Sequence, residues 1–292
     1  MRWLEFTKMH GAGNDFVVLD ALAHEIPPLE KLAERIADRH LGVGCDQILV
    51  IRASEVADFR MDIYDADGSL VEMCGNGIRA VLKYLRDRGH TTAEEISVET
   101  LGGVVRPRWM GDDTVRVDMG QPVLAAAKIP TGLSAGDGPV LDVPLAVGGQ
   151  TVSVSCVSMG NPHAVVYVDD PDAAPVTTLG PQIETHPEFP NRTNVEFVSI
   201  ESRGRIRQRT WERGTGETLA CGSGACAVGV ASMLRGVVEN QVEIVLRGGT
   251  LQIEWAGGDS HVFMTGPAAE VFTGRFPLPG AEVFTGRFPL ED

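Results

Sequence analysis

The chain contains a long internal repeat, which constrains its fold more than any other feature of the sequence. The segment YDADGSLVEMCGNGIRAV (64–81) resembles WERGTGETLACGSGACAV (211–228), and in both a Cys-Gly-x-Gly sequence precedes a helix-like run. Cys74 and Cys221 are 147 residues apart in this alignment. Self-similarity at a fixed offset indicates that one structural unit occurs more than once.

The same offset aligns polar residues outside the cysteine motifs, without a gap. It relates Asn14 to Asn161, Gln47 to Asn194, Asp65 to Glu212, Gly75 to Gly222 and Asn76 to Ser223. A single Cys-Gly-x-Gly match could arise by chance, whereas several polar positions in one register could not easily do so. We therefore interpret the chain as two halves of the same fold, each of which contributes one thiol.

Apolar patterning predicts mostly short strands with a few helices. The expected strands are 16–20, 47–51, 59–66, 96–100 and 114–119 in the first half, and 151–159, 164–170, 195–200 and 205–211 in the second. Helix-like segments span 29–40, 77–89 and 224–236, so one long helix follows each cysteine. This pattern predicts an α+β unit that is used twice.

The stretch 121–141 is rich in Pro, Gly and Ser and is the expected junction between the halves. We expect an N-terminal half, 1–120, with Cys74, and a C-terminal half, 121–265, with Cys221. The tail, about 266–292, is expected to join the N-terminal half. Within it the decapeptide AEVFTGRFPL occurs at 269–278 and again at 281–290. Such an exact copy is typical of a recent duplication without function, and a dimer-contact strand is the alternative.

Charge and apolar content narrow the classes of function. The 292 residues carry a net charge of −15 and no Lys/Arg stripe, which argues against a nucleic-acid partner. No apolar run approaches the roughly 20 residues of a membrane span, and the first residues show no apolar signal-peptide core. We therefore expect a cytoplasmic protein without a membrane partner.

The five cysteines do not suggest disulfides or zinc. Their number is odd and no pair has C-x-x-C spacing, which disfavours a disulfide framework and a structural zinc site. We expect reduced thiols and no bound metal. Cys45, Cys156 and Cys226 are expected to be inert buried residues.

Cys74 and Cys221 differ from these because glycines and a helical run follow each of them. A helix N-terminus offers unpaired N–H groups and about half a positive charge, and a free thiol there, with an ordinary pKa of roughly 8.5, is expected to be activated. Glycines let a ligand approach the backbone. Each cysteine is therefore expected to be an activated thiol beside a site for a small carboxylate.

Two such sites that face each other across a cleft suit one reaction. One thiolate removes the proton next to a bound carboxylate, and the opposite thiol returns a proton to the other face. The helix N-termini stabilise the negative charge that develops on the substrate. The predicted activity is racemisation or epimerisation of an amino acid without a cofactor.

Four motifs resemble those of diaminopimelate epimerases: KMHGAGNDFVVLD, DADGSLVEMCGNGIRA, SMGNPHAVV and ERGTGETLACGSGACA. They span residues 8–228, so the resemblance covers most of the chain. It implies two pseudo-symmetric domains, each a curved, mainly antiparallel sheet around a central helix, with the active site in the cleft between them. It also implies a cytoplasmic homodimer that converts LL-diaminopimelate into the meso form for lysine and cell-wall synthesis.

The resemblance also implies residue roles. Cys74 is similar to the base that acts on the LL-substrate and Cys221 to the acid, with the roles exchanged in reverse. The reacting carboxylate would be held by Gly75, Asn76, Gly222 and Ser223, assisted by Asn14 and Gln47. The distal amine and carboxylate would be recognised by Asn161, Asn194, Glu212 and Arg213, and Arg213 suits a carboxylate. His163 is expected to have a supporting role.

One residue departs from the family pattern. Asp65 stands where the family typically has an Asn that helps to hold the distal end of the substrate. A carboxylate there can accept a bond from the distal ammonium, but it repels the distal carboxylate unless it is protonated or turned away. The departure bears on affinity and substrate preference more than on the type of reaction.

The sequence leaves three alternative functions open. A related epimerase acting on proline or hydroxyproline is disfavoured, because such substrates have no second carboxylate for Arg213. A thiol–disulfide redox protein could use Cys74 and Cys221 as its pair, although redox pairs rarely accompany two carboxylate-binding helix ends. A non-catalytic binding domain is disfavoured because both thiols are retained.

Overall fold

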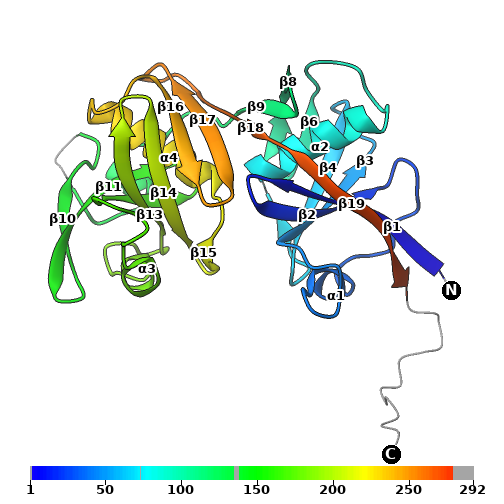
Figure 1. Cartoon of the computed structure of the whole chain (residues 1–292), viewed down its shortest axis with the longest axis horizontal. Helices are drawn as coiled ribbons and strands as arrows, with labels where there is room; N and C mark the ends of the chain where they lie inside the picture. The colour runs from blue at the N-terminus through cyan, green and yellow to red at the C-terminus, as the bar shows by residue number, and fades with distance from the viewer. Residues whose placement is uncertain (1, 73, 135–137, 279–292) are drawn as a thin grey trace, which may run out of the picture.

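The computed structural model describes residues 2–72, 74–134 and 138–278, and they form two sheet-rich lobes (Figure 1). The first lobe has an 8-stranded sheet in the order β19-β1-β2-β3-β4-β6-β7, with β5 paired to β4. Its strands are β1 (Arg2–Gly11), β2 (Asn14–Asp20), β3 (Gln47–Arg52), β4 (Phe59–Asp65), β5 (Leu70–Val71), β6 (Val98–Thr100), β7 (Gly103–Val105) and β19 (Ala269–Leu278). Its helices are α1 (Ala33–Ala37) and α2 (Gly75–Asp87).

The second sheet has 11 strands in the order β10-β11-β12-β13-β14-β16-β17-β18-β9-β8, with β15 paired to β14. Most of it forms the second lobe, while β9 and β8 lie beside α2 in the first lobe (Figure 1). The strands of this sheet are β8 (Arg108–Gly111), β9 (Thr114–Asp118), β10 (Val143–Val147), β11 (Gln150–Ser158), β12 (Pro162–Tyr167), β13 (Asn194–Ser202), β14 (Arg205–Glu212), β15 (Gly216–Thr218), β16 (Gln241–Leu246), β17 (Gly249–Trp255) and β18 (Val262–Pro267). The helices are α3 (Val176–Glu184), α4 (Gly222–Leu234) and the short 3₁₀-helix η1 (Ala126–Lys128).

The structure preserves the register of the sequence repeat. Helices α2 and α4 begin at Gly75 and Gly222, 147 residues apart, and have the same length of 13 residues. In the sheets, Phe16 pairs with Gln47 between the parallel strands β2 and β3, and His163 pairs with Asn194 between β12 and β13. The expected α+β fold of two similar halves is confirmed, and each sheet is mainly antiparallel with two parallel pairings.

The two long helices lie against their sheets because they carry apolar faces. In α2, Ile78, Val81, Leu82 and Leu85 are fully buried and pack in the core of the first lobe. Helix α4 is small and apolar almost throughout its length, and its residues from Gly224 to Ser232 are all buried in the second lobe. The helices therefore hold their N-terminal ends, with the two cysteines, in fixed positions.

Two connections tie the lobes together. Strand β9 pairs with β18 in the second sheet, but its Val115 and Val117 pack in the core of the first lobe. The chain then passes from β18 to β19, which pairs with β1 at the edge of the first sheet (Figure 1). The first copy of the duplicated decapeptide forms β19, and the second copy lies outside the described residues.

One expectation about helices was wrong, and one helix was missed. The segment 29–40 is helical only from Ala33 to Ala37, because the Asp38 carboxylate accepts the N–H groups of His40 and Leu41 and turns the chain out of the helix. Helix α3 was not predicted, since Pro181 interrupts its helical pattern in the sequence. Within the described part of the chain, no helix is long and apolar enough to cross a membrane.

Candidate active site

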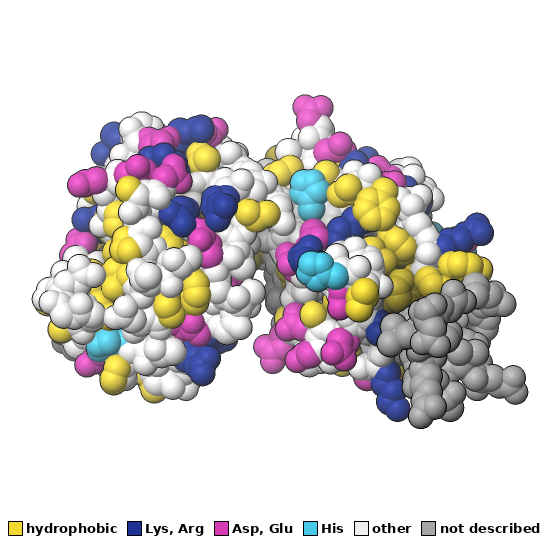
Figure 2. Space-filling view, turned by 60° about the horizontal axis from the view of Figure 1, so that its bottom comes forward, with side chains coloured by type: hydrophobic (Ala, Val, Ile, Leu, Met, Phe, Trp, Pro, Cys, Tyr) yellow, Lys and Arg dark blue, Asp and Glu magenta, His cyan; other side chains and the backbone are white. Residues whose placement is uncertain are grey.

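A cavity of about 930 Å³ lies between the lobes and is lined by residues of both. Its lining includes both repeat cysteines and the predicted substrate-binding residues other than Asn194, namely Asn14, Gln47, Asp65, Gly75, Asn76, Asn161, Glu212, Arg213, Gly222 and Ser223. Figure 2 shows the notch between the two lobes, with acidic side chains gathered on one side of it. The folded chain therefore brings residues far apart in sequence to one site.

Cys74 is the N-cap residue of α2. Its backbone is extended, with φ −139° and ψ 106°, and the N–H of Gly77 donates to its Sγ over 3.3 Å. The Cys74 thiol also donates to Asn14 Oδ1 at 3.7 Å. A thiol in this position contacts both the free end of the helix and an amide of the cavity wall.

Cys221 has the matching position before α4, with φ −123° and ψ 111°. Its Sγ lies 3.5 Å from Ser223 Oγ. Buried carboxylates lie near it: Glu212 on β14 and Glu196 on β13 both act on its charge. The two thiols are related by the repeat but have different electrostatic surroundings.

The expectation that the helix ends activate both thiols in the free protein was wrong. Burial raises the pKa of Cys74 to about 11, although the N–H groups of Gly77 and Asn76 and the charge of Arg79 act in the opposite direction. Burial, Glu212 and Glu196 raise the pKa of Cys221 well above its ordinary value. Loss of water around a thiolate outweighs the helix terminus at both positions.

The N-terminal ends of α2 and α4 are close to each other, and side chains pack tightly against their first glycines. A Cβ atom at Gly222 would lie 3.3 Å from Asn76 Oδ1 and 3.2 Å from Met264 Sδ. A Cβ atom at Gly75 would lie 3.0 Å from Met264 Cε. The first N–H groups of both helices therefore border the same small space, as expected for a carboxylate site.

Asp65 does not project freely into the cavity. Gln47 and Asp65 are paired on neighbouring strands β3 and β4, and the Gln47 Nε2 donates to Asp65 Oδ1 over 2.8 Å. The amide of Gln47 thus partly satisfies the carboxylate. Asp65 lines the same cavity as Glu212 and Arg213.

Two buried residues, Asn194 and His163, hydrogen-bond to residues that line the distal side of the cavity. Asn194 is buried and does not line the cavity. Its Oδ1 accepts the N–H of Arg213 at 2.9 Å, and its Nδ2 donates to Pro162 O. His163 is also fully buried, with Nε2 at 3.0 Å from Asn161 Oδ1. Both residues contact residues that line the cavity, and neither lines it.

Two buried residues near the site were missed in the sequence. The Oε1 atom of Glu196 lies 2.7 Å from His163 Nδ1, while its Oε2 has no hydrogen-bond partner among the described residues. Arg79 lies in α2 with none of its surface exposed. Neither has a like residue at the repeat offset, since Leu49 and Cys226 occupy those positions. In the sequence, Arg79 stands out only as a single charged residue between apolar neighbours.

The cavity is acidic. Its lining contains the carboxyl groups of Asp46, Asp65, Asp67, Glu72 and Glu212, and Arg213 is the one cation in it among the described residues. Such a lining favours ligands that carry ammonium groups. Over the ranges that the structure describes, no group of three or more His, Cys, Asp or Glu residues is placed to hold a metal ion.

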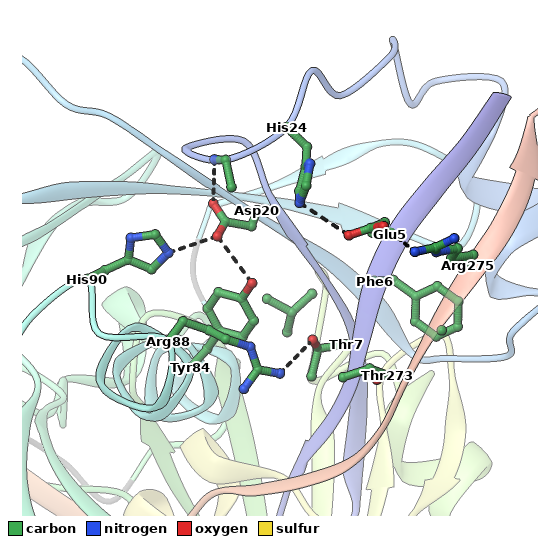
Figure 3. A pocket seen from close by; sticks show the side chains of 13 residues that line it. Glu5, Phe6, Thr7, Asp20, His24, Tyr84, Arg88, His90, Thr273 and Arg275 are labelled. Carbon is green, nitrogen blue, oxygen red and sulfur yellow. Dashed lines mark hydrogen bonds and ion pairs between the residues drawn. The ribbon is translucent and has the colours of Figure 1, made fainter.

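A second cavity, of about 570 Å³, lies beside β1 and β19 in the first lobe (Figure 3). Asp20 accepts bonds from Tyr84 Oη and lies 2.9 Å from His90 Nε2, while Arg88 donates to Thr7 and Glu270. Its charged side chains are thus paired with each other or with neighbours, and neither repeat cysteine lines it. The cavity between the lobes is the candidate active site.

Solved structures share the whole fold. A hydroxyproline epimerase from Agrobacterium vitis matches with a TM-score of 0.68 over 94% of this chain and 91% of that chain, at 17% identity. A PhzF-family phenazine biosynthesis protein from Bacillus anthracis matches with a TM-score of 0.69 over 95% and 100%, at 16% identity. The chain therefore has the two-lobed fold shared by PhzF-family proteins and hydroxyproline epimerases.

Sequence comparison identifies the particular family. The profile described as Diaminopimelate epimerase matches residues 6–125 and 155–271. A diaminopimelate epimerase from Moorella thermoacetica is 50% identical over 94% of this chain and 100% of its own length. One from Leptospira biflexa is 50% identical over 93% and 98%. The chain belongs to the diaminopimelate epimerase family.

Proposed function

We propose that the protein interconverts LL- and meso-diaminopimelate by proton transfer through Cys74 and Cys221, without a bound cofactor. The observation that carries this proposal is that two repeat-related thiols cap two helices whose ends border one cavity. Membership of the family supports diaminopimelate as the substrate, and therefore a place in lysine and peptidoglycan precursor synthesis.

The proposed reaction starts with the substrate carboxylate at the N-termini of α2 and α4, beside Asn76 and Ser223. The Cys74 thiolate takes the α-proton of the LL-centre and becomes a thiol. The Cys221 thiol gives its proton to the opposite face and becomes a thiolate, so charge and protons balance. A high thiol pKa suits this step, because a buried thiolate is a strong base for a weakly acidic α-proton.

The distal end of the substrate would lie against Asp65, Asn161, Glu212 and Arg213. Burial raises the pKa of Glu212, while the Thr218 hydroxyl, which donates to its Oε1, and the charge of His163 oppose the rise. A carboxylate in this position suits the distal ammonium, and the exposed Arg213 suits the distal carboxylate. Proline and hydroxyproline would leave both groups without a partner.

The test is conversion by the purified, reduced protein of LL-diaminopimelate, proline and trans-4-hydroxyproline in parallel. We expect meso-diaminopimelate from the first substrate and no epimerisation of the other two. Turnover of a proline substrate with none of diaminopimelate would contradict the assignment. A disulfide between the two repeat cysteines as the active form would instead indicate a redox protein.

We further propose a cytoplasmic homodimer that associates through the β1–β19 face. Strand β19 lies at an edge of its sheet, and Trp3, Val271 and Phe272 are about half exposed there. The two working thiols require a reducing compartment, which supports the location. Phe272→Glu is expected to convert the dimer into a monomer in sedimentation velocity, with Val104→Glu, on another exposed strand, as the control. Equal dimer formation by both variants would exclude this face.

A further inference from the structure

Arg79 is a buried cation at the junction of the two lobes. It lies one helical turn after Gly75 in α2, and its side chain is fully buried. Its guanidinium donates to Asn76 Oδ1 at 2.8 Å, to Pro267 O at 3.2 Å and to Gly75 O at 3.3 Å. Among the described residues it forms no ion pair with a carboxylate.

A guanidinium buried in this way is unfavourable unless an anion offsets its charge. Burial lowers the pKa of Arg79 to about 10, so the group still carries its charge at neutral pH. The first turn of α4 is close to this group, since Asn76 Oδ1 accepts the Arg79 bond and would lie 3.3 Å from a Cβ atom added at Gly222. The charge is therefore placed beneath the proposed carboxylate site.

Arg79 also determines how two amides of the cavity are oriented. Because arginine only donates hydrogen bonds, Asn76 must direct its Oδ1 to Arg79 and its Nδ2 to Asn14 Oδ1, 3.2 Å away. Because a carboxylate only accepts, Asn14 must direct its Nδ2 to Asp46 Oδ2, at 2.7 Å. In this orientation of the Asn14 amide, its Oδ1 faces the Cys74 thiol.

The second half has no equivalent arrangement. At the repeat offset, Ser223 replaces Asn76 and Cys226 replaces Arg79. Around Cys221 the buried charges are instead the carboxyl groups of Glu212 and Glu196, with His163 beside them. The charges that act on Cys74 are those of Arg79 and of Glu212 on β14. Further charged residues line the shared cavity, namely Asp46, Asp65, Glu72 and Arg213.

We propose that Arg79 is a positioning residue that fixes the orientation of the Asn76 and Asn14 amides beside the proposed carboxylate site and favours ionisation of Cys74 over Cys221. The proposal for Arg79 rests on the proposed function for the identity of the carboxylate ligand. The effect on the two thiols is a property of the free protein and does not depend on the substrate.

The experiment measures alkylation of Cys74 and Cys221 by iodoacetamide in the free, reduced protein near pH 8, with each cysteine followed by peptide mass spectrometry. In Arg79→Met we expect the Cys74 rate to fall by roughly threefold to tenfold, because the Arg79 charge favours the thiolate but influences its pKa less than burial and the N–H groups of Gly77 and Asn76 do. The Cys221 rate should change little and serves as the internal reference. Arg86→Met, at the other end of α2, is the matched control and should leave both rates unchanged.

An unchanged Cys74 rate in Arg79→Met would overturn the proposal, and so would an equal fall at Cys221, which would indicate a general structural effect. Arg79→Lys provides the second variant should the methionine protein not fold. It retains the charge, so the Cys74 rate should stay close to that of the wild type, while KM for LL-diaminopimelate rises about tenfold from the loss of a charged hydrogen bond. Loss of Cys74 reactivity in the lysine variant would also contradict the proposal. If the thiol rates behave as expected but no variant and no wild type turns over LL-diaminopimelate, the proposed function fails and the role of Arg79 in thiol ionisation stands.

Discussion

Asp65 shows how a single side chain can change the recognition of the distal end of the substrate. Its carboxylate is held by Gln47 on one oxygen and adds negative charge to a cavity that already contains Glu212. The substrate brings both an ammonium and a carboxylate to this region. Glu212 already provides a partner for the ammonium, so the second carboxylate, Asp65, mainly repels the distal carboxylate.

Asp65→Asn is expected to lower KM for LL-diaminopimelate roughly two- to fivefold, because removal of one half-buried charge from the cavity wall changes an interaction by up to about 1 kcal/mol. The amide retains an oxygen that can accept the Gln47 bond. Asp67→Asn, which removes a neighbouring carboxyl group of the lining, is the control. The same decrease in both variants would indicate only a change in the overall charge of the cavity, and no decrease in either would mean that Asp65 is harmless.

The repeat predicted both thiols and several polar residues of the cavity lining, but not the buried residues behind them. Asn14, Asn76 and Glu212 could be found because each aligns with a polar residue in the other half. Arg79 and Glu196 could not be found in this way, because their charges occur in one half only. Their importance depends on burial, which a sequence pattern around a single residue does not determine.

Among the elements, the two cysteine-capped helices followed directly from the sequence, and the connections between lobes did not. Helices α2 and α4 are long, begin at glycines and have apolar faces, so local patterning was sufficient. Strand 114–119 was also expected, but its pairing with β18 joins residues about as far apart as the two cysteines. Pairing between such distant segments is not encoded in local periodicity.

One contact between turns of the two lobes has a direct test. A Cβ atom at Gly248, between β16 and β17, would lie 2.0 Å from the carbonyl oxygen of Ala12, between β1 and β2. Gly248→Ala must therefore displace backbone next to Asn14, and we expect a loss of about 1–3 kcal/mol of stability together with a raised KM. Thermal unfolding and steady-state kinetics measure both effects.

Gly204→Ala is the control for this change, because nothing lies within 4 Å of a Cβ atom at that position in the turn between β13 and β14. It should leave the melting temperature and KM close to those of the wild type. A melting temperature for Gly248→Ala equal to that of the control would show that the turns do not hold the lobes together.

For the whole molecule, buried thiols make stability depend on alkaline pH. Burial raises the pKa of Cys45, Cys156 and Cys226 to about 12, from an ordinary value of 9.0 that the unfolded chain is expected to have. Above that ordinary value the unfolded state loses thiol protons that the folded state keeps. The free energy of unfolding should therefore fall as pH rises from about 9 towards 12, and be unaffected by these groups below that window.

Cys226→Ala is expected to make this fall shallower by about 1.4 kcal/mol per pH unit, the contribution of one thiol. Cys226 is fully buried in α4 and lines neither cavity, so the variant should keep its activity. Urea unfolding under reducing conditions at a series of alkaline pH values measures the slope. A slope identical to that of the wild type would mean that Cys226 ionises equally in both states.

The central claim is that two thiols, one from each half, exchange protons with opposite faces of one carbon. The most direct measurement is deuterium incorporation from D₂O during the first few per cent of conversion of LL-diaminopimelate, in wild type, Cys74→Ala and Cys221→Ala. We expect one deuterium at the inverted centre of the meso product, almost none in the remaining LL-substrate, and loss of turnover in both variants. Meso product without deuterium, or full turnover in either alanine variant, would contradict it.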